Sequence, residues 1–386
     1  MRIDQVKIHR ITLPFSFEFS HSLRKRSSVN NVIVEIIAEQ GEIIGFGEGA
    51  PRSYVTGESP ESMSKSIRHF IQQDTFPQEL NDVSQIWNFI DEITRGREQN
   101  AAICALETGL LDAFGKSQDR YILDYFSKDF IADNIYYGAA IPLDNNQKIM
   151  ELCRLIKKMK INTLRLKLGK DFEQNKEIVE TVHAAFGGNH DIRVDINCSW
   201  DRKLAFEHIP LIKNYKIKVV EQPMMPDEPS IADFAARMQI EDVILMADES
   251  ACSLVDMEKI AKEGYYKMIN VRLSKCGGFR NSLKIIDYLR TKGILFQIGC
   301  QLGESGILSA AGRALCLLCG DAVYYDGSYD EFMLKENTTL ENVSFEPGGK
   351  AGPLNSPGLG VNVDAQRLKN ISYHSEIISI SNPLSF

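Results

Sequence analysis

The sequence predicts an α/β protein in which a parallel (β/α) barrel follows an α+β unit. Eight short apolar runs recur between residues 135 and 327, with helix-like stretches between them. One ionisable side chain stands at the carboxyl end of five successive runs. A doubly wound open sheet is the alternative arrangement of the same elements.

Composition is typical of a soluble globular protein. The chain has 386 residues, of which 44% are hydrophobic and 25% charged. Its net charge of −8 argues against a nucleic-acid partner, and no apolar run reaches the roughly 18 residues of a membrane span. The first residues, MRIDQVKIHRITLPF, lack the apolar stretch of a signal peptide. We therefore expect a cytoplasmic protein whose eight cysteines stay reduced.

The N-terminal third has the pattern of a sheet followed by helices. Residues 1–50 alternate like strands, and VIVEIIAEQGEIIGFGE holds two apolar runs separated by a turn with a glycine. From residue 59 to residue 116 the period becomes helical. There AAICALETGLLDAFGK spaces its large apolar side chains by three or four residues and is expected to stop at Gly115.

The eight apolar runs of the middle segment are the predicted barrel strands. They are IYYGAAIPL, LRLKLG, DIRVDIN, IKVVEQP, VILMAD, MINVRL, ILFQIGC and AVYYDG. Between the second and third runs, Asp171 stands at a helix cap and Gly187 at the helix end. The last fifty residues are rich in turn formers, so we expect them to add no barrel unit and to pack back on the first domain.

Charged side chains close five successive runs. Lys167 closes the second run, Asp195 the third, Glu221 the fourth and Asp248 the fifth, and Lys275 follows the sixth. Successive members are 28, 26, 27 and 27 residues apart, so each βα unit supplies one. Because the carboxyl ends of barrel strands form the active face of such a fold, we expect these side chains to meet there.

The three carboxylates indicate a metal site. Asp195, Glu221 and Asp248 come from adjacent strands, and three converging anions repel one another unless a cation lies among them. Ligands that are all oxygen favour a hard ion, Mg²⁺ before Mn²⁺. Such an ion holds a substrate carboxylate and stabilises the charge formed when the α-proton leaves.

The two lysines indicate acid/base chemistry. Lys167 and Lys275 belong to strands four apart in a ring of eight, so they face each other across the barrel mouth. A nearby metal and Arg165 favour the neutral amine, which accepts a proton. Arg165 itself stays protonated, and either it lowers the pKa of Lys167 or it forms a structural ion pair.

Together these motifs resemble the enolase superfamily, in its muconate-lactonizing-enzyme (mandelate racemase/muconate cycloisomerase-like) subgroup. LRLKLG is similar to the KxK motif, KCGG to the second-lysine motif, and VDIN, VEQP and ADES to the metal-ligand motifs. GFGEGAPRSYVTGES looks like the capping-domain strand and loop, and PGLGVNVD like the tail that returns to the cap. The resemblance implies a TIM-type (β/α)7β barrel at 131–335, capped by an α+β domain at 1–130 and a C-terminal segment at 336–386 that returns to the cap.

The resemblance also implies a function. Asp195, Glu221 and Asp248 would be Mg²⁺ ligands, and Lys167 and Lys275 would be the acid/base catalysts acting through an enediolate. We expect an epimerase or racemase, or a cycloisomerase, that acts on a small carboxylic acid and assembles as a homo-oligomer. A dehydratase or β-eliminating lyase for acid sugars or hydroxy-acids is the alternative. The candidate residues around the ligands are Asn197 and Glu249.

Two further classes of function remain open on the residues alone. A lysine acting as a Schiff-base nucleophile would leave the three carboxylates unexplained. A non-catalytic ligand-binding barrel would be expected to lack one of the ligands or lysines, and none is missing from the sequence.

Several residues bear on the substrate. Dipeptide epimerases of the subgroup carry Asp-x-Asp at the eighth strand to hold an ammonium, whereas YYDGSY has Asp326 followed by Ser328, which disfavours a dipeptide. Glu304 either binds an ammonium or hydroxyl group or caps the next helix. A basic lid suits a substrate with a distal carboxylate or phosphate, unless its cations are only solvated surface charges. The predicted lid residues are Arg24, Arg26 and Arg52.

Overall fold

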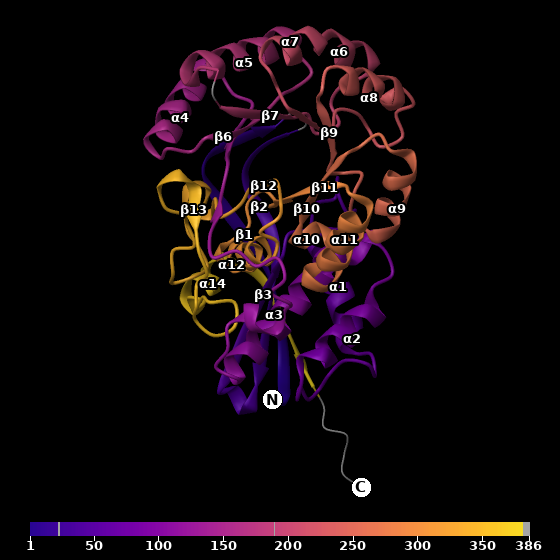
Figure 1. The fold of residues 1–386 in the computed structure, drawn as a ribbon. Helices are drawn as coiled ribbons and strands as arrows, with labels where there is room; N and C mark the ends of the chain where they lie inside the picture. The colour runs from indigo at the N-terminus through magenta and orange to yellow at the C-terminus, as the bar shows by residue number, and fades with distance from the viewer. Residues whose placement is uncertain (22–23, 189, 381–386) are drawn as a thin grey trace.

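The computed structural model describes residues 1–21, 24–188 and 190–380, and the side chains of residues 17–26 lie outside that description. The side chains of the predicted lid residues Arg24 and Arg26 are therefore not described. An antiparallel sheet and the helices beside it make one end of the molecule (Figure 1). A curled parallel sheet surrounded by helices makes the other end.

The antiparallel sheet contains four strands in the order β14-β1-β2-β3. Strand β14 comes from the C-terminal segment and pairs with β1, for example Val6 with Ile378. The tail therefore returns to the first sheet, as predicted. The strand bounds are β1 (Ile3–His21), β2 (Arg24–Ala38), β3 (Ile43–Gly49) and β14 (Ser372–Ser379).

Helix α3 (Asn100–Ser117) lies between this sheet and the barrel, in contact with β2 and β3 on one side and with the barrel helices on the other. The glycines of GFGEG allow that approach. A Cβ atom at Gly47 would lie 2.1 Å from the carbonyl oxygen of Ala105, and Gly45 and Gly49 face α3 equally closely. Because strand side chains alternate, three glycines spaced by two give β3 one smooth face.

Eight parallel strands form the second sheet, in the order β12-β11-β10-β9-β8-β7-β6-β5. Its two edges meet where the Gly138 N–H donates to the Tyr325 carbonyl at 2.9 Å and the Tyr329 hydroxyl donates to the Gly138 carbonyl at 2.7 Å. The predicted barrel is thereby confirmed in place of the open sheet. The strands are β5 (Ala139–Ile141), β6 (Thr163–Lys167), β7 (Asp191–Asp195), β8 (Val219–Glu221), β9 (Ile244–Ala247), β10 (Met268–Arg272), β11 (Leu295–Gly299) and β12 (Tyr324–Tyr325).

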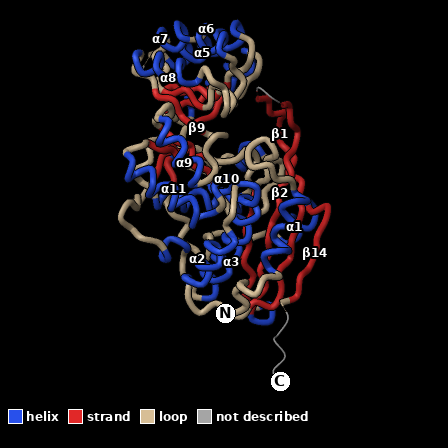
Figure 2. Tube along the Cα trace, turned by 90° about the vertical axis from the view of Figure 1, so that its right-hand side faces the viewer, coloured by secondary structure: helices blue, strands red, loops and turns tan. Residues whose placement is uncertain are grey.

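Helices cover the outside of the barrel, and Figure 2 shows α5 to α8 at the end remote from the four-stranded sheet. As predicted, Asp171 caps α5, accepting from the Gln174 N–H at 2.9 Å, and Gly187 ends it with φ of 72°. The remaining helices are α1 (Pro60–Ile71), α2 (Val83–Ile93), α4 (Asn146–Lys158), α5 (Phe172–Phe186), α6 (Arg202–Glu207), α7 (Ile209–Asn214), α8 (Ile231–Ile240), α9 (Leu254–Glu263), α10 (Leu273–Cys276), α11 (Gly278–Lys292), α12 (Gly306–Leu318), α13 (Asp330–Met333) and α14 (Ala365–Ile371).

Two local predictions need correction. The run IYYGAAIPL is not one strand, because β4 (Ile135–Tyr136) pairs with β13 (Lys350–Ala351) outside the barrel and only β5 joins β6. Helix α3 does not stop at Gly115. That glycine serves a close approach instead, since a Cβ there would lie 2.7 Å from the Cα of Gly358.

Two general expectations concern membranes and cysteines. Among the described residues, no helix is both long enough and apolar enough to span a bilayer. All eight cysteines are free thiols, and six of them are buried. Burial raises the pKa of Cys252 to about 12, so that thiol stays protonated at neutral pH.

Candidate active site

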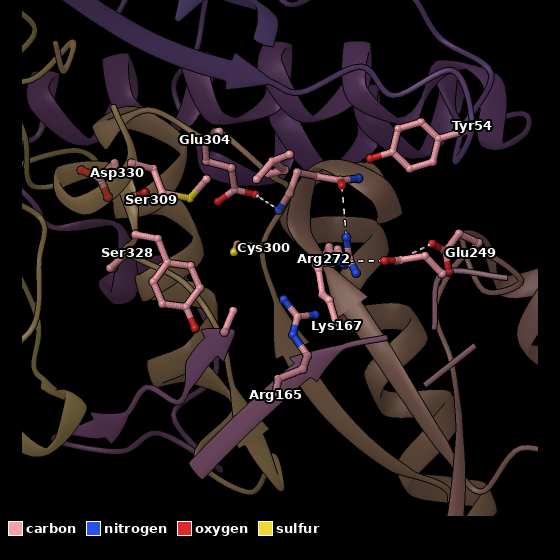
Figure 3. Close-up of a pocket in the computed structure, with 17 residues that line it drawn as sticks. Tyr54, Arg165, Lys167, Glu249, Arg272, Cys300, Glu304, Ser309, Ser328 and Asp330 are labelled. Carbon is pink, nitrogen blue, oxygen red and sulfur yellow. Dashed lines mark hydrogen bonds between the residues drawn. The ribbon is translucent and has the colours of Figure 1, made fainter. Parts of the chain in front are cut away.

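A cavity lies at the carboxyl ends of the barrel strands, and Figure 3 shows the side chains that line it. Its wall includes Arg165 and Lys167 from β6 and Tyr54 from the first domain. Leu164 and Leu166, which alternate with these two cations along the strand, are fully buried on the other face of β6. The alternation in LRLKLG thus separates a helix-facing apolar row from a cationic row that faces the barrel interior.

Lys167, Asp195 and Glu221 lie side by side at the last positions of three neighbouring strands. Asp195 is the register partner of Lys167 on one side and of Glu221 on the other. The Lys167 Nζ donates to Asp195 Oδ2 at 3.0 Å. Both carboxylates are 0% exposed. The structure therefore brings together three of the residues that the strand spacing singled out.

Asp248 follows β9, and Lys275 lies in α10 immediately after β10. The Lys275 Nζ donates to Asp248 Oδ1 at 2.8 Å, to the Asp248 carbonyl at 2.7 Å and to the Asn270 carbonyl at 2.6 Å. These bonds occupy all three donors of the ammonium group. Lys275 is 0% exposed, whereas Lys167 lines the cavity. The two predicted acid/base groups therefore differ in access.

Two arginines lie among the three carboxylates. The Arg165 Nη1 is 3.5 Å from Glu221 Oε2 and 3.6 Å from Asp195 Oδ2. The Arg272 Nη2 contacts Asp248 Oδ2 and lies 3.5 Å from Glu221 Oε1. Sequence reasoning offered two roles for Arg165, and its contacts are those of an ion-pair partner of the carboxylates.

Burial and the neighbouring charges shift the pKa values of these side chains in different directions. Burial raises the pKa of Asp195, but the charges of Lys167 and Arg165 outweigh burial and lower it to about 2. Burial and the charge of Asp195 raise the pKa of Glu221 to about 7. Burial lowers the pKa of Lys275, but the Asp248 carboxylate outweighs it and the net shift is upward. Additional positive charge near Glu221 would relieve the repulsion among the carboxylates.

The chemistry of the donor set fits a hard divalent cation. Asp195, Glu221 and Asp248 offer only carboxylate oxygens at three neighbouring strand ends. As these side chains stand, no group of three or more His, Cys, Asp or Glu residues within the described ranges has the arrangement of a metal site. Guanidinium groups contact the same oxygens instead. An ion bound there would require Arg272 to release Asp248.

Asn197 and Glu249 continue the hydrogen-bonded chain from Lys167. The Lys167 Nζ donates to Asn197 Oδ1 at 2.9 Å, and the Asn197 Nδ2 donates to Glu249 Oε1 at 3.0 Å. Asn197 has φ of 47°, in the left-handed region that asparagine tolerates better than most residues. Burial and the neighbouring Asp248 raise the pKa of Glu249 to about 8. Both residues line the cavity.

The predicted substrate contact at Arg52 needs correction. Arg52 is 2% exposed and donates to Asn31 Oδ1 at 3.0 Å, and it also contacts the Leu302 carbonyl. These contacts join the first domain to the loop after β11. Arg52 therefore supports the cavity wall from behind and is not one of the side chains that line the cavity.

Glu304 lines the cavity, whereas Asp326 lies behind its wall. The Glu304 Oε1 accepts from the Gln301 N–H at 2.6 Å. Ser305 is the residue that caps α12, so the alternative helix-capping role predicted for Glu304 is wrong. Asp326 is 1% exposed and forms ion pairs with two arginines, so it is not presented to a ligand.

Sequence reasoning missed four residues around the cavity. Gln301 accepts at Oε1 from the Arg272 Nη1 at 3.3 Å, and its buried Nε2 has no hydrogen-bond partner. Its signal in the sequence is its place in GCQLGES, directly after a barrel strand and three residues before the ionisable Glu304. The other three are Arg193, Arg272 and Asp330.

Comparison with known proteins identifies the family. A family model described as "Enolase C-terminal domain-like" matches residues 148–367. The hydrophobic dipeptide epimerase of Enterococcus faecalis is 30% identical over 319 residues, covering 81% of this chain and 87% of that protein. The N-succinyl-L-Arg/Lys racemase of Bacillus cereus is 24% identical over 383 residues, covering 98% of this chain and 100% of that protein.

A solved structure shares the whole architecture. The dipeptide epimerase from Enterococcus faecalis V583, complexed with Mg and the dipeptide L-Leu-L-Tyr, superposes with a TM-score of 0.81 at 25% identity. The match covers 94% of this chain and 100% of that one. The family model spans more than half of the chain, and the motifs at the strand ends lie within it. The chain therefore belongs to the enolase superfamily of enzymes.

Proposed function

We propose that this chain is a Mg²⁺-dependent isomerase that removes the proton α to the carboxylate of a small acid, with Lys167 and Lys275 as its acid/base pair. The observation that supports this most directly is the row of Lys167, Asp195 and Glu221 along three strand ends. Asp248 and Lys275 follow the next two strands. Because the relatives are epimerases and racemases, epimerisation or racemisation is favoured over cycloisomerisation or elimination.

Asp195, Glu221 and Asp248 are the residues that would hold Mg²⁺. When bound, the ion supplies a positive charge that holds the substrate carboxylate and stabilises the negative charge left by the departing proton. The relative that was crystallised with Mg and a dipeptide supports this choice of ion.

Lys167 acts as the general base or acid for the α-proton on the open side of the cavity. Its Nζ is held between Asp195 Oδ2 and Asn197 Oδ1, which fixes the direction of the amine. The neutral form keeps a lone pair that accepts the α-proton from this face, and the protonated form donates a proton to the same face when the proton has been removed from the other side. Asn197 is itself held by Glu249, so the amine, the amide and the carboxyl group form one positioned chain.

Lys275 acts as the general base or acid on the opposite face of the substrate α-carbon. Asp248 is the charge that keeps the pKa of Lys275 high. Any charge that neutralises Asp248 therefore lowers the pKa of Lys275 and favours its neutral, proton-accepting form. Arg272 lies in the cavity wall beside Asp248 and stays protonated, which suits it to orient a carboxylate.

Loss of either lysine is expected to slow the interconversion of the two stereoisomers strongly. General acid–base groups contribute about 10²–10⁴-fold, so Lys167→Ala and Lys275→Ala should each lower the rate at least about a hundredfold. Lys170→Ala, three residues beyond Lys167 and exposed, is the matched control and should retain the rate.

The measurement uses substrate pools of N-acyl amino acids, dipeptides and hydroxy-acids in D₂O with Mg²⁺. Mass spectrometry reads deuterium at the α-carbon, and chiral chromatography reads the stereoisomers. Racemisation at an unchanged rate after the loss of either lysine would contradict the two-base mechanism. β-Elimination products in place of deuterium-exchanged substrate would show that the enzyme is a lyase and not an isomerase.

A further inference from the structure

Strand β14 leaves one edge of the four-stranded sheet open. In the order β14-β1-β2-β3, β14 pairs with β1 on one side, and no other strand of the described residues pairs with its opposite side. Figure 2 shows β14 at the outer margin of the molecule. An open edge presents a row of backbone N–H and C=O groups to its surroundings. This edge can therefore accept one further strand.

The hydrogen bonds of β14 establish which of its backbone groups point outward. The Ile380 N–H donates to the Asp4 carbonyl at 2.9 Å, and the pairing with β1 continues without interruption back to His374, beyond which the register shifts. The backbone groups of successive residues in a strand point to opposite sides. Ser375 and Ile377 therefore direct their N–H and C=O groups away from β1.

The side chains of β14 do not protect this edge in the usual way. Its sequence, SYHSEIIS, holds neither a lysine nor a proline, the residues that commonly prevent an edge strand from pairing. Two of its large apolar side chains are well exposed, Tyr373 by 49% and Ile377 by 61%. An open edge that also carries exposed apolar side chains is expected to associate with another strand.

The strand is complementary to itself in one antiparallel register. With a two-fold axis at Ser375, that residue faces its own copy, and the outward backbone groups of both meet. His374 then lies opposite the partner's Glu376, and Tyr373 lies opposite the partner's Ile377. An imidazole opposite a carboxylate and an aromatic ring opposite a β-branched side chain are both favourable cross-strand pairs. Symmetry makes each pair occur twice.

The neighbouring registers are less favourable. A two-fold axis at Glu376 would place two carboxylates directly opposite each other, and an axis at His374 would place two imidazoles there; like charges directly opposite are destabilising. An axis between two residues would oppose an outward-pointing backbone group to an inward-pointing one, which antiparallel pairing does not allow. Ser375 is therefore the centre that suits both the backbone and the side chains.

We propose that β14 pairs antiparallel with β14 of a second copy of this chain, about a two-fold axis at Ser375, so that two four-stranded sheets join into one sheet of eight strands. The partner is a second copy because the complementarity is that of the strand with itself. A contact of this kind uses the same surface on both chains and closes after two of them. No residue of β14 lines the cavity, so the pairing is independent of the proposed reaction.

Sedimentation velocity of the full chain over a range of concentrations measures the association. The unmodified chain should form a dimer, and Ile377→Lys should raise its dissociation constant at least about tenfold, because a charge on an edge strand opposes pairing. Ile44→Lys is the matched control. Ile44 lies on β3, the opposite edge strand, and is 39% exposed, so its replacement should leave the dissociation constant unchanged. Circular dichroism checks that both variants are folded.

Cross-linking at the two-fold axis tests the register. In Ser375→Cys the two introduced thiols would stand on residues whose Cα atoms are about 5.5 Å apart, and a short bifunctional thiol reagent should join the chains. In Ile377→Cys the two thiols would be four residues apart along the paired strands, about 13 Å, and the same reagent should not join them. The unmodified chain, treated in the same way, controls for the natural thiols.

A monomer at every concentration up to about 100 μM, where an interface with a micromolar Kd is filled, would overturn the proposal and leave the edge to a strand of another protein. Equal dissociation constants for the unmodified chain and Ile377→Lys would overturn it too. So would a dimer that the reagent does not join in Ser375→Cys, even if Ile377→Lys does not fold. A larger assembly supports the pairing if Ile377→Lys breaks it into smaller units and Ser375→Cys is joined, and otherwise counts against it.

Discussion

Asp248 illustrates how single side chains in the site serve several neighbours. Its carboxylate contacts Arg272 on one oxygen and Lys275 on the other. Replacing it with an uncharged residue would leave two buried cations with fewer partners. Removal of one member of a buried ion pair typically costs about 3–5 kcal/mol, so variants at such positions need a folding control before their rates are interpreted.

His208 supports the strand that carries Lys167, although it lies away from the cavity. Its Nε2 accepts from the Asn175 side-chain amide at 3.0 Å, and its Nδ1 donates to the Leu204 carbonyl at 2.7 Å. Asn175 in turn holds the backbone of Gly169, two residues after Lys167. The ring stacks on Trp200, with centroids 4.1 Å apart. These contacts require the neutral imidazole.

Stability should therefore fall as the solution is acidified. Burial lowers the pKa of His208 below that of an unfolded histidine, about 6.5, so between these values the unfolded state binds the extra proton. The stability that neutral His208 contributes is fully present above about pH 6.5, and it is lost as the pH falls toward the lowered pKa. The free energy of unfolding then changes with a limiting slope of about 1.4 kcal/mol per pH unit. Urea unfolding of the chain and of His208→Gln from pH 7.5 to pH 5 measures it. Parallel slopes in the two proteins would contradict this assignment.

At the scale of elements, the glycine face of β3 sets the distance between the first sheet and α3. A Cβ at Gly47 would meet backbone atoms, the Ala105 carbonyl oxygen at 2.1 Å and the Gly109 nitrogen at 2.3 Å. Backbone atoms of two packed elements do not yield as a flexible side chain does. The strand or the helix would have to move.

Gly47→Ala should destabilise the protein by about 1–3 kcal/mol, the usual cost of overpacking a core. Gly312→Ala is the matched comparison, because Gly312 lies inside α12 and a Cβ there meets nothing within 4 Å. It should raise the free energy of unfolding by about 0.5–1 kcal/mol. Chemical unfolding of both variants measures whether each change lowers or raises the free energy of unfolding. A Gly47→Ala variant with an unchanged free energy of unfolding would show that α3 is free to shift.

Elements that leave a local pattern in the sequence could be predicted, and elements that depend on distant pairing could not. The barrel strands were found because their apolar runs and closing charges repeat along the chain every 26 to 28 residues. The division of IYYGAAIPL was not, since it depends on pairing with Lys350–Ala351, more than two hundred residues away. Local sequence records the period of a strand and does not record its distant partner.

The same reasoning applies to the site. Lys167, Asp195 and Glu221 stand at equivalent strand positions, so their convergence follows from the topology alone. Arg272 ends its strand in the same way, yet its contacts with Asp248 depend on side-chain directions across the barrel. Asp330 lies beyond the end of β12, and the turn at Ser328 that returns it to the cavity wall leaves no repeating pattern in the sequence.

At the scale of the whole molecule, buried polar contacts join the two parts. The Glu48 carboxylate of β3 accepts from the Ser305 hydroxyl at 2.6 Å and from the Leu308 N–H at 3.0 Å, at the start of the barrel helix α12. Arg52 contacts the loop just before it. The loop that carries Gln301 and Glu304 is thereby held by the first domain, while the strand ends are held by the barrel.

Metal binding should be visible in the stability of the entire chain. A ligand that binds only the native state stabilises it by about 2.7 kcal/mol at a hundredfold excess over its Kd. Mg²⁺ should therefore raise the thermal unfolding midpoint, and EDTA should reverse the shift. Asp195→Asn should abolish the response, whereas Asp233→Asn, an exposed carboxylate on α8, should retain it. An equal shift in both variants would place the ion elsewhere.

The pairing of β14 with β1 has a consequence for how the molecule is made. These neighbours in one sheet, Val6 and Ile378 among them, are separated by nearly the entire barrel in the chain. During synthesis on a ribosome, β1 can find β2 early, but its outer edge stays open until the last strand emerges. A nascent chain therefore carries an unpaired β-edge through most of its translation. Folding factors that shield such edges would be needed longest for this part of the protein.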